Sequence, residues 1–432
     1  MLFGLAWPTS VGMIAFMAMN VVDSVCVGQL GGAQQAGVSA ANAWGLSGAV
    51  LAMGAVRAME PIVAQAYGEG DRETAGRALV RMLVLALPLS VLAGGWYLLA
   101  PWGLRLLGQP ESVIPHAAAY VGPMALAWPI ALLSQTLRTF LQAIGNVRPA
   151  MVVTVGFTLF KVPLNLWLMH GGGPMPALGV AGVGISTLVV DLLVLLTLAW
   201  AVRGTLREWW PASPELTGPA LLGLLRLGLP LGVQMGTEFW AFASMGVMMG
   251  WLGEAQLAAH SVAINLASVS FMLPLGVSSA AAARVGHRFG AGEDWGMAAR
   301  VALLMGVATQ VFSGSIFWFA GGWLVEPYSP DLAVRTLAAS LLPIAAAFQL
   351  FDGVQVISFG ILRGAGDVKV PTVANLVGYY AFGLPVAYLL GFPGGFGAEG
   401  VWWGLSLGLA VVSAGLLWRI RFVRRRGGVR LR

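Results

Sequence analysis

Apolar runs long enough to cross a lipid bilayer recur along the whole chain, and no other feature restricts its fold as much. Of the 432 residues, 58% are hydrophobic and 10% are charged, whereas a soluble domain has about 25% charged residues. The chain is therefore an integral membrane protein. The runs contain Gly and Pro and lack the alternation of membrane β-strands, which predicts an all-α fold. Twelve spans are expected, near residues 2–28, 36–60, 79–100, 117–143, 149–170, 179–203, 222–250, 256–282, 298–325, 336–362, 371–391 and 398–421.

The basic residues outside these spans are biased toward alternate loops. Of 24 lysines and arginines, 19 lie in the loops after the even-numbered spans and in the C-terminal tail, whereas Arg105 and Arg335 alone lie in the opposite loops. Cytoplasmic loops are enriched in Lys and Arg, so we expect both termini in the cytoplasm and the chain in the inner membrane. The basic tail is explained as an anchor on anionic lipid. Nucleic acid is not an expected partner, because the tail is short and lacks interleaved aromatic residues.

The chain also repeats itself at an offset of 222 residues. Pro8 matches Pro230, and Gly28-Gln-Leu-Gly-Gly-Ala-Gln34 matches Gly250-Trp-Leu-Gly-Glu-Ala-Gln256. Six spans per half is an even number, so the two lobes are parallel repeats, an arrangement found in secondary transporters that work by alternating access. The expected parts are an N-terminal lobe at 1–204, a cytoplasmic linker at 205–220, a C-terminal lobe at 221–421 and a basic tail at 422–432.

Four motifs, two in each half of the chain, resemble those of multidrug and toxic compound extrusion (MATE) transporters. They are Val22-Asp-Ser-Val-Cys-Val-Gly28, Pro61-Ile-Val-Ala-Gln-Ala-Tyr-Gly68, Leu252-Gly-Glu-Ala-Gln-Leu-Ala-Ala-His260 and Leu362-Arg-Gly-Ala-Gly-Asp367. The resemblance implies a V-shaped pair of six-helix lobes that works as a monomer. It also implies efflux of cationic, amphipathic organic compounds in exchange for Na⁺ or H⁺, with no bound cofactor.

Two carboxylates stand in the middle of predicted spans of the C-terminal lobe. Glu238 lies in Gly-Thr-Glu-Phe-Trp and Asp352 in Leu-Phe-Asp-Gly-Val, and neither has a basic residue one helical turn away. A charged residue at the centre of a membrane helix costs roughly 2.5–3.5 kcal/mol on insertion scales. A buried carboxylate favours its protonated form, and a cation can replace that proton. The resemblance implies that both residues couple H⁺ or Na⁺ to export, with Na⁺ held only transiently, whereas the structural alternative is hydrogen bonding to nearby polar groups.

In the N-terminal lobe, Asp23 matches the acidic residue that the family uses for proton or cation binding. The family commonly has one Asn two residues before and another two residues after the proline of the fifth span. Here that stretch is Lys161-Val-Pro-Leu-Asn165, so a lysine replaces the first Asn. We expect Lys161 to form an ion pair with Asp23 and to oppose Na⁺, with Asn165 beside them. A purely structural salt bridge is the alternative.

The residues that follow Glu238 are candidates for contact with a substrate. They are Phe239, Trp240, Phe242 and Met245, and aromatic faces and thioethers suit varied cationic ligands. Such stripes are more often helix packing or lipid contact. For Asp191, which belongs to no motif, we expect a structural or interfacial role, and for Arg138 we expect a brace near the cytoplasmic end.

Three other functions are alternatives to efflux. A passive channel is disfavoured, because a two-lobe repeat with isolated carboxylates suits alternating access. A flippase for a lipid-linked precursor would need a basic cavity for a pyrophosphate, but the charges inside these spans are mainly acidic. An enzyme would need an Asp-rich metal motif or a clustered His/Asp pair, and the sequence contains neither.

Overall fold

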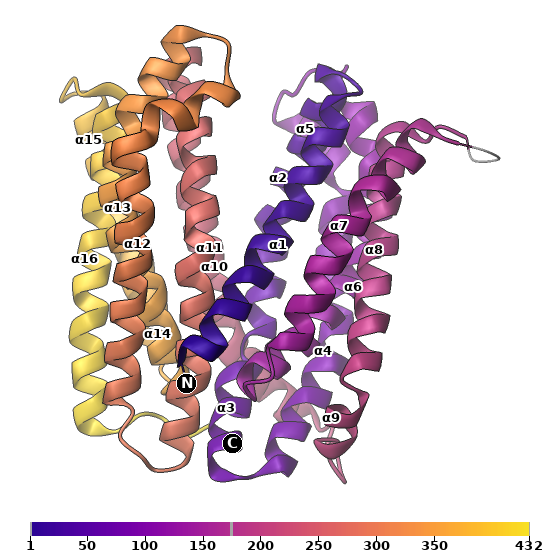
Figure 1. Cartoon of the computed structure of the whole chain (residues 1–432), viewed down its shortest axis with the longest axis vertical. Coiled ribbons are helices and arrows are strands. Elements are labelled where there is room, and N and C mark those ends of the chain that lie inside the picture. Colours follow the sequence, from indigo (N-terminus) through magenta and orange to yellow (C-terminus); the bar gives the residue numbers. More distant parts are fainter. Residues whose placement is uncertain (1, 173–175, 432) are drawn as a thin grey trace. The chain divides into compact units, whose positions relative to one another are not determined.

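The computed structural model describes residues 2–172 and 176–431, and helices make up nearly all of them (Figure 1). In chain order they are α1 (Leu2–Gly28), α2 (Gly32–Val56), α3 (Met59–Glu69), α4 (Arg72–Leu98), α5 (Ala100–Leu106), α6 (Ile114–Ala143), α7 (Arg148–His170), α8 (Gly179–Ala201), α9 (Arg203–Glu208), α10 (Gly218–Leu252), α11 (Glu254–Gly290), α12 (Gly296–Val325), η1 (Glu326–Tyr328), α13 (Leu332–Gly364), α14 (Lys369–Leu376), η2 (Val377–Gly383), α15 (Leu384–Gly391) and α16 (Gly397–Arg426).

Within the described residues, 12 helices are long and apolar enough to cross a membrane. Three of these spans combine more than one helix, and one of them, Gly296–Tyr328, joins α12 to the short helix η1. Gly32–Glu69 combines α2 with α3, and Lys369–Gly391 combines α14, η2 and α15, where η2 is a π-helix. The predicted all-helical fold with twelve spans is confirmed, although several spans begin or end some residues away from the predicted bounds.

The chain divides into two compact units. The N-terminal unit is Val11–Gly232, and the C-terminal unit combines Met1–Ser10 with Val233–Arg432. Both α1 and α10 therefore contribute residues to both units. In the C-terminal unit, Ser10 donates a hydrogen bond to the Leu273 carbonyl at 3.1 Å. The predicted lobe and linker boundaries stay predictions.

Close helix contacts in each unit depend on glycine. A Cβ on Gly54 of α2 would lie 2.4 Å from the Gly232 backbone, and one on Gly404 of α16 would lie 2.2 Å from the Ala387 backbone. Helix association in lipid relies on such close packing of small residues, because the apolar solvent provides no hydrophobic force between helices. Larger side chains fill the remaining core, with Trp402 buried completely.

The internal repeat is visible in the backbone. Gly31 precedes α2 with φ of 132°, and Gly253, its partner at the predicted offset, precedes α11 with φ of 139°. Residues other than glycine rarely adopt this backbone conformation. An added Cβ would also meet the corresponding glutamine side chain in each case, Gln34 at 2.8 Å and Gln256 at 2.6 Å. The two halves therefore make the same tight turn between their first and second spans.

The linker after α8 is attached to the ends of α3 and α4. Arg77 and Arg81 of α4 both form ion pairs with Glu215, at 3.0 and 3.2 Å. Glu73 accepts hydrogen bonds from the backbone N–H groups of residues 212 and 213. At the same end of α4, Asp71 caps the helix by accepting from the Thr74 N–H at 3.0 Å and from its hydroxyl at 2.6 Å. These hydrogen bonds hold the pKa of the Asp71 carboxyl below its ordinary value.

Candidate cation and substrate sites

The C-terminal unit brings Glu238 of α10 against two amide side chains from other spans. Gln355 of α13 and Asn375 of α14 each donate a hydrogen bond to Glu238 Oε1, both at 3.1 Å. The Gln355 amide also donates to Asn375 Oδ1 at 3.1 Å, and Asn375 donates to the Gln234 carbonyl at 3.3 Å. A carboxylate can only accept hydrogen bonds, and both amides present their donors to it. The network therefore supports a negative charge on Glu238.

The same network includes Tyr379, which the π-helix η2 positions. The Gln355 amide lies 3.5 Å from the Tyr379 hydroxyl, and the Tyr379 ring is 1% exposed. A π-helical turn offsets the side chains that follow it from the faces they would occupy on an α-helix, and such turns are frequent at functional sites. The interruption of α14 thus places a phenol beside the amides that bind Glu238.

Asp352 precedes Gln355 by one turn on α13. Its side chain is buried and interacts electrostatically with Glu238. No hydrogen bond reaches its carboxylate from the residues that the structure describes. The Gln355 Oε1 atom is also buried without a hydrogen-bond partner. Glu238 thus has two amides and, through Gln355, a phenol nearby, and Asp352 is a second buried carboxylate one turn from Gln355. Like-charged carboxylates cannot both remain ionised at low cost without a proton or a cation.

In the N-terminal unit, Asp23 of α1 is held by three side chains. Lys161 Nζ of α7 lies 2.7 Å from Asp23 Oδ2, and the Asn165 amide donates to Oδ1 at 2.8 Å. The Thr187 hydroxyl of α8 lies 3.2 Å from Oδ2. Lys161 and Asp23 are 2% and 5% exposed, so this is a buried pair. The predicted ion pair is confirmed, and its role in transport stays a prediction.

A second pair of charges lies farther along the same unit. Asp191 follows Thr187 by one turn of α8 and interacts electrostatically with Lys161, Asp23 and Arg138. The Arg138 guanidinium of α6 lies 5.8 Å from the centre of the Phe16 ring, and its buried Nε has no hydrogen-bond partner. The N-terminal unit thus brings Asp23 and Asp191 near Lys161 and Arg138. The Asp23 carboxylate of this unit has a basic partner, Lys161, at 2.7 Å.

The candidate substrate-contact residues have different surroundings. Phe242 packs edge-on against Phe348 and Tyr379, at centroid distances of 5.9 and 6.2 Å. Met245 is completely buried in the core of the C-terminal unit. Trp240 is 38% exposed, and Phe239 is half-buried. Phe242 therefore connects the aromatic core to the Glu238 network, whereas Met245 occupies a packing position.

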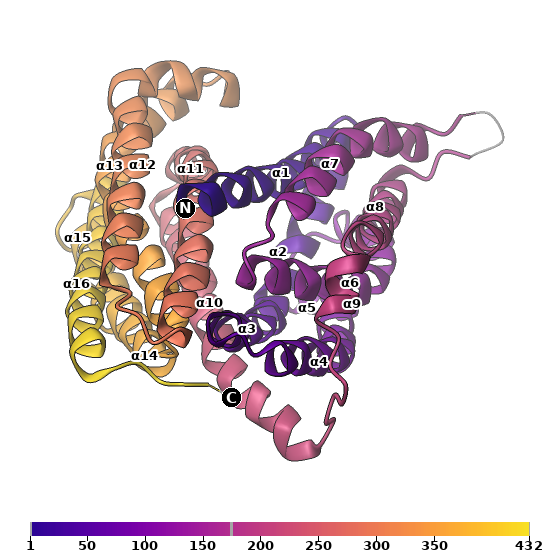
Figure 2. The same cartoon turned by 60° about the horizontal axis from the view of Figure 1, so that its bottom comes forward.

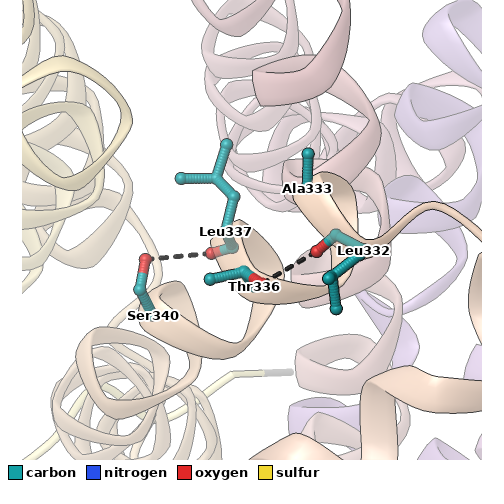
Figure 3. Close-up of a pocket in the computed structure, with 5 residues that line it drawn as sticks. All are labelled: Leu332, Ala333, Thr336, Leu337 and Ser340. Atoms are coloured by element: carbon teal, nitrogen blue, oxygen red, sulfur yellow. Dashed lines mark hydrogen bonds between the residues drawn. The ribbon is translucent and has the colours of Figure 1, made fainter.

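A hollow at the start of α13 has a lining of uncharged side chains. It measures about 620 Å³ and is lined by Leu332, Ala333, Thr336, Leu337 and Ser340. In Figure 3 the two hydroxyls bond to backbone carbonyls of their own helix, Thr336 to Leu332 and Ser340 to Leu337. The lining contains no charged group, so this hollow offers nothing that would select a cation.

Sequence reasoning identified Asn165 beside Asp23 but missed the other neutral members of both sites. The missed residues are polar side chains in otherwise apolar spans, and this was the only sign in the sequence that they belong to a site. They are Gln355, Asn375 and Tyr379 around Glu238, and Thr187 beside Asp23. Polar residues in such spans are common enough that the signal does not choose among them. The packing of separate helices brings these four to the carboxylates.

Comparison with known proteins identifies the family. The sequence profile of the MatE family matches residues 8–167 and 230–389. The multidrug resistance protein NorM of Burkholderia vietnamiensis is 35% identical over 96% of this chain and 92% of its own length. The multidrug resistance protein PmpM of Pseudomonas aeruginosa is 33% identical over 98% of this chain and 91% of its own length.

Solved structures show the same fold. The crystal structure of the eukaryotic MATE transporter AtDTX14 superimposes with a TM-score of 0.86, at 22% identity and 98% coverage of both chains. A MATE transporter in a bent conformation gives a TM-score of 0.88 at 19% identity, covering 98% of this chain and 96% of that one. The described helices, the repeated halves and these relatives agree that the chain is a multi-pass membrane transporter, not an enzyme, and that it belongs to the MatE family.

Proposed function

We propose that the chain is a secondary active exporter that exchanges H⁺ or Na⁺ for cationic, amphipathic organic compounds. The observation that carries this proposal is the oxygen-rich site at Glu238 and Asp352. Asp352 is buried, and a carboxylate inside a membrane span needs a bound proton, a bound cation or a partner. A cationic substrate that approaches the same site competes with that ion. Release of one on binding of the other is the basis of exchange.

The two units have different parts in this proposal. Lys161 provides a permanent counter-charge for Asp23 at 2.7 Å, so the N-terminal site needs no Na⁺ to remain buried. A second cation beside the ammonium group would be repelled. In the C-terminal site, the two side chains that donate to Glu238 at 3.1 Å are neutral amides, Gln355 and Asn375. We therefore place ion coupling at Glu238 and Asp352, and alternating access of the two lobes moves the site between the two sides.

The proposed topology has both termini in the cytoplasm of an inner-membrane protein that works as a monomer. The charge bias of the loops supports this orientation. The relatives named as multidrug resistance proteins support organic cations as cargo. The acidic site opposes a flippase of lipid-linked pyrophosphates, since an anionic cargo would be repelled there.

Transport by the purified protein in sealed vesicles tests this function. Ethidium should be expelled from the cytoplasmic side when a Na⁺ or an H⁺ gradient is imposed, and not when both gradients are absent. Glu238→Gln and Asp352→Asn should each abolish gradient-driven export, because both keep the shape and remove the charge. Glu111→Gln is the matched control, since Glu111 is an exposed acid with a side chain 75% exposed. Gradient-independent ethidium flux, equal in all four proteins, would show that the chain is a passive pathway.

A further inference from the structure

Two arginines of the short helix α9 lack the acidic partners that neighbouring arginines have. Arg72, Arg77 and Arg81 of α4 all form ion pairs with Glu208 or Glu215. Among the residues that the structure describes, no acidic side chain lies within ion-pair distance of Arg203 or Arg207. These two stand four residues apart and share one helix face, and like charges in that arrangement repel each other. An unneutralised pair of this kind favours an external anion.

The orientation of α9 is set by the residue that follows it. Trp209 is buried and stacks on the Tyr67 ring at 5.5 Å, with the Arg72 guanidinium 5.5 Å from its centre. This contact fixes one side of the segment to α3 and α4. Arg203 and Arg207 are exposed, so they lie on a surface that the rest of the N-terminal unit does not cover. Figure 2 shows α9 with the end of α8 on one side and the linker on the other.

A hollow of about 400 Å³ lies at this surface, lined by Arg203, Leu206, Arg207 and Trp210. Its volume is within the ordinary range of small-molecule sites, roughly 300–1,000 Å³. The lining combines two cations with an aliphatic and an aromatic side chain. A free inorganic anion would use the cations only, whereas a lipid uses both kinds of surface.

The neighbouring residues mark the level of the membrane interface. The α8 span ends at Ala201, two residues before Arg203. Trp200 and Trp210, on either side of α9, are 66% and 56% exposed, and exposed tryptophans at span ends are typical of the headgroup level. The Arg203 guanidinium lies 4.6 Å from the Trp200 ring centre and donates to the Trp200 carbonyl at 3.1 Å. This guanidinium is therefore held at the end of the α8 span, beside an exposed tryptophan.

We propose that α9 binds one anionic phospholipid. Its phosphate would lie between Arg203 and Arg207, and the headgroup end of its acyl chain would lie against Leu206 and Trp210. The site is independent of the ion and the cargo that the transporter exchanges. A bound lipid would supply the counter-charge that Arg203 and Arg207 lack and would fasten the linker to the membrane surface.

The test is hydrogen–deuterium exchange of the whole transporter in nanodiscs of phosphatidylcholine, with or without phosphatidylglycerol. Phosphatidylglycerol should slow exchange in residues 200–212. The double variant Arg203→Gln with Arg207→Gln should lose this protection. Arg226→Gln, an exposed arginine of α10 outside the hollow, should retain it. Native mass spectrometry should show the double variant binding phosphatidylglycerol about 30-fold more weakly, which corresponds to ~2 kcal/mol for two basic residues.

Three results would overturn the proposal. Equal protection in the wild type and the double variant would place the lipid elsewhere. Equal loss of protection in Arg226→Gln would indicate a diffuse charge effect with no defined site. Protection by inorganic phosphate in phosphatidylcholine nanodiscs would mean that a soluble anion, and not a lipid, is the occupant.

Discussion

Replacing Lys161 with Met should destabilise the protein, and replacing Asp23 with Asn at the same time should restore most of the loss. Lys161→Met keeps the length of the aliphatic stem and removes the charge. The Asp23 carboxylate would then retain the Asn165 and Thr187 donors, at 2.8 and 3.2 Å, and lose the ammonium at 2.7 Å. A buried carboxylate without its counter-charge must either stay ionised at high cost or bind a proton.

The size of the effect follows from these two routes. Breaking a buried ion pair costs about 3–5 kcal/mol while the orphaned group stays charged. Protonating a carboxyl with an ordinary pKa of about 3.9 requires about 4 kcal/mol at pH 7 and about 1.5 kcal/mol at pH 5. The cheaper route sets the loss, so we expect about 3–4 kcal/mol at pH 7 and no more than about 1.5 kcal/mol at pH 5. The loss therefore grows as the pH rises, because the folded variant must bind a proton that the unfolded chain releases.

Equilibrium unfolding in mixed micelles, followed by tryptophan fluorescence, measures these free energies. In a double-mutant cycle the coupling between Lys161 and Asp23 should be about 2 kcal/mol or more at pH 7. The matched control is the exposed pair Arg105 and Glu111, at 3.3 Å, for which coupling should stay below about 1 kcal/mol. Additivity within about 0.5 kcal/mol for the buried pair would refute the reasoning.

Three further predictions concern other parts of the molecule. Asp71→Ala should lower the free energy of unfolding by about 1 kcal/mol, because it removes the N-cap of α4. The pKa of the Asp71 carboxyl is lowered in the folded protein, so unfolding measurements should show this difference from wild type at neutral pH. The difference should vanish as the pH falls below about 4, where the carboxyl becomes protonated. Gln355→Leu removes a donor from Glu238 and should reduce ethidium export in vesicles while the amount of folded protein stays constant; wild-type export would exclude the amide from the site. In a variant without the native cysteine, a cysteine introduced at Gly292 should react with a membrane-impermeant thiol reagent only from the cytoplasmic side, and one introduced at Ser329 only from outside. The reverse pattern would invert the proposed topology.

The fold could be predicted from the sequence because membrane spans depend on local composition. Apolar runs located the helices, and the repeat that pairs Gly31 with Gly253 appears in the backbone as two turns with the same positive φ. The interruption of the eleventh span by a π-helix was not predicted.

The two sites were predicted unequally for a physical reason. Charged residues in apolar spans are rare and need partners, so the sequence alone was enough to pair Asp23 with Lys161. Neutral amides carry no such requirement, and Asn375 could not be assigned to Glu238 without the packing of α10 against α14. Asp191 shows the same limit, because its electrostatic interaction with Arg138 depends on how α6 and α8 face each other.

The central claim is that Glu238 and Asp352 hold the ion that the substrate displaces. The most direct test counts the ions released when ethidium binds to the purified protein, using a pH indicator for H⁺ and ²²Na for sodium. We predict that the wild type releases H⁺ or Na⁺ in a fixed ratio to bound ethidium, and that the double variant Glu238→Gln with Asp352→Asn releases neither. Undiminished ion release from the double variant would contradict the assignment and place the coupling site elsewhere in the chain.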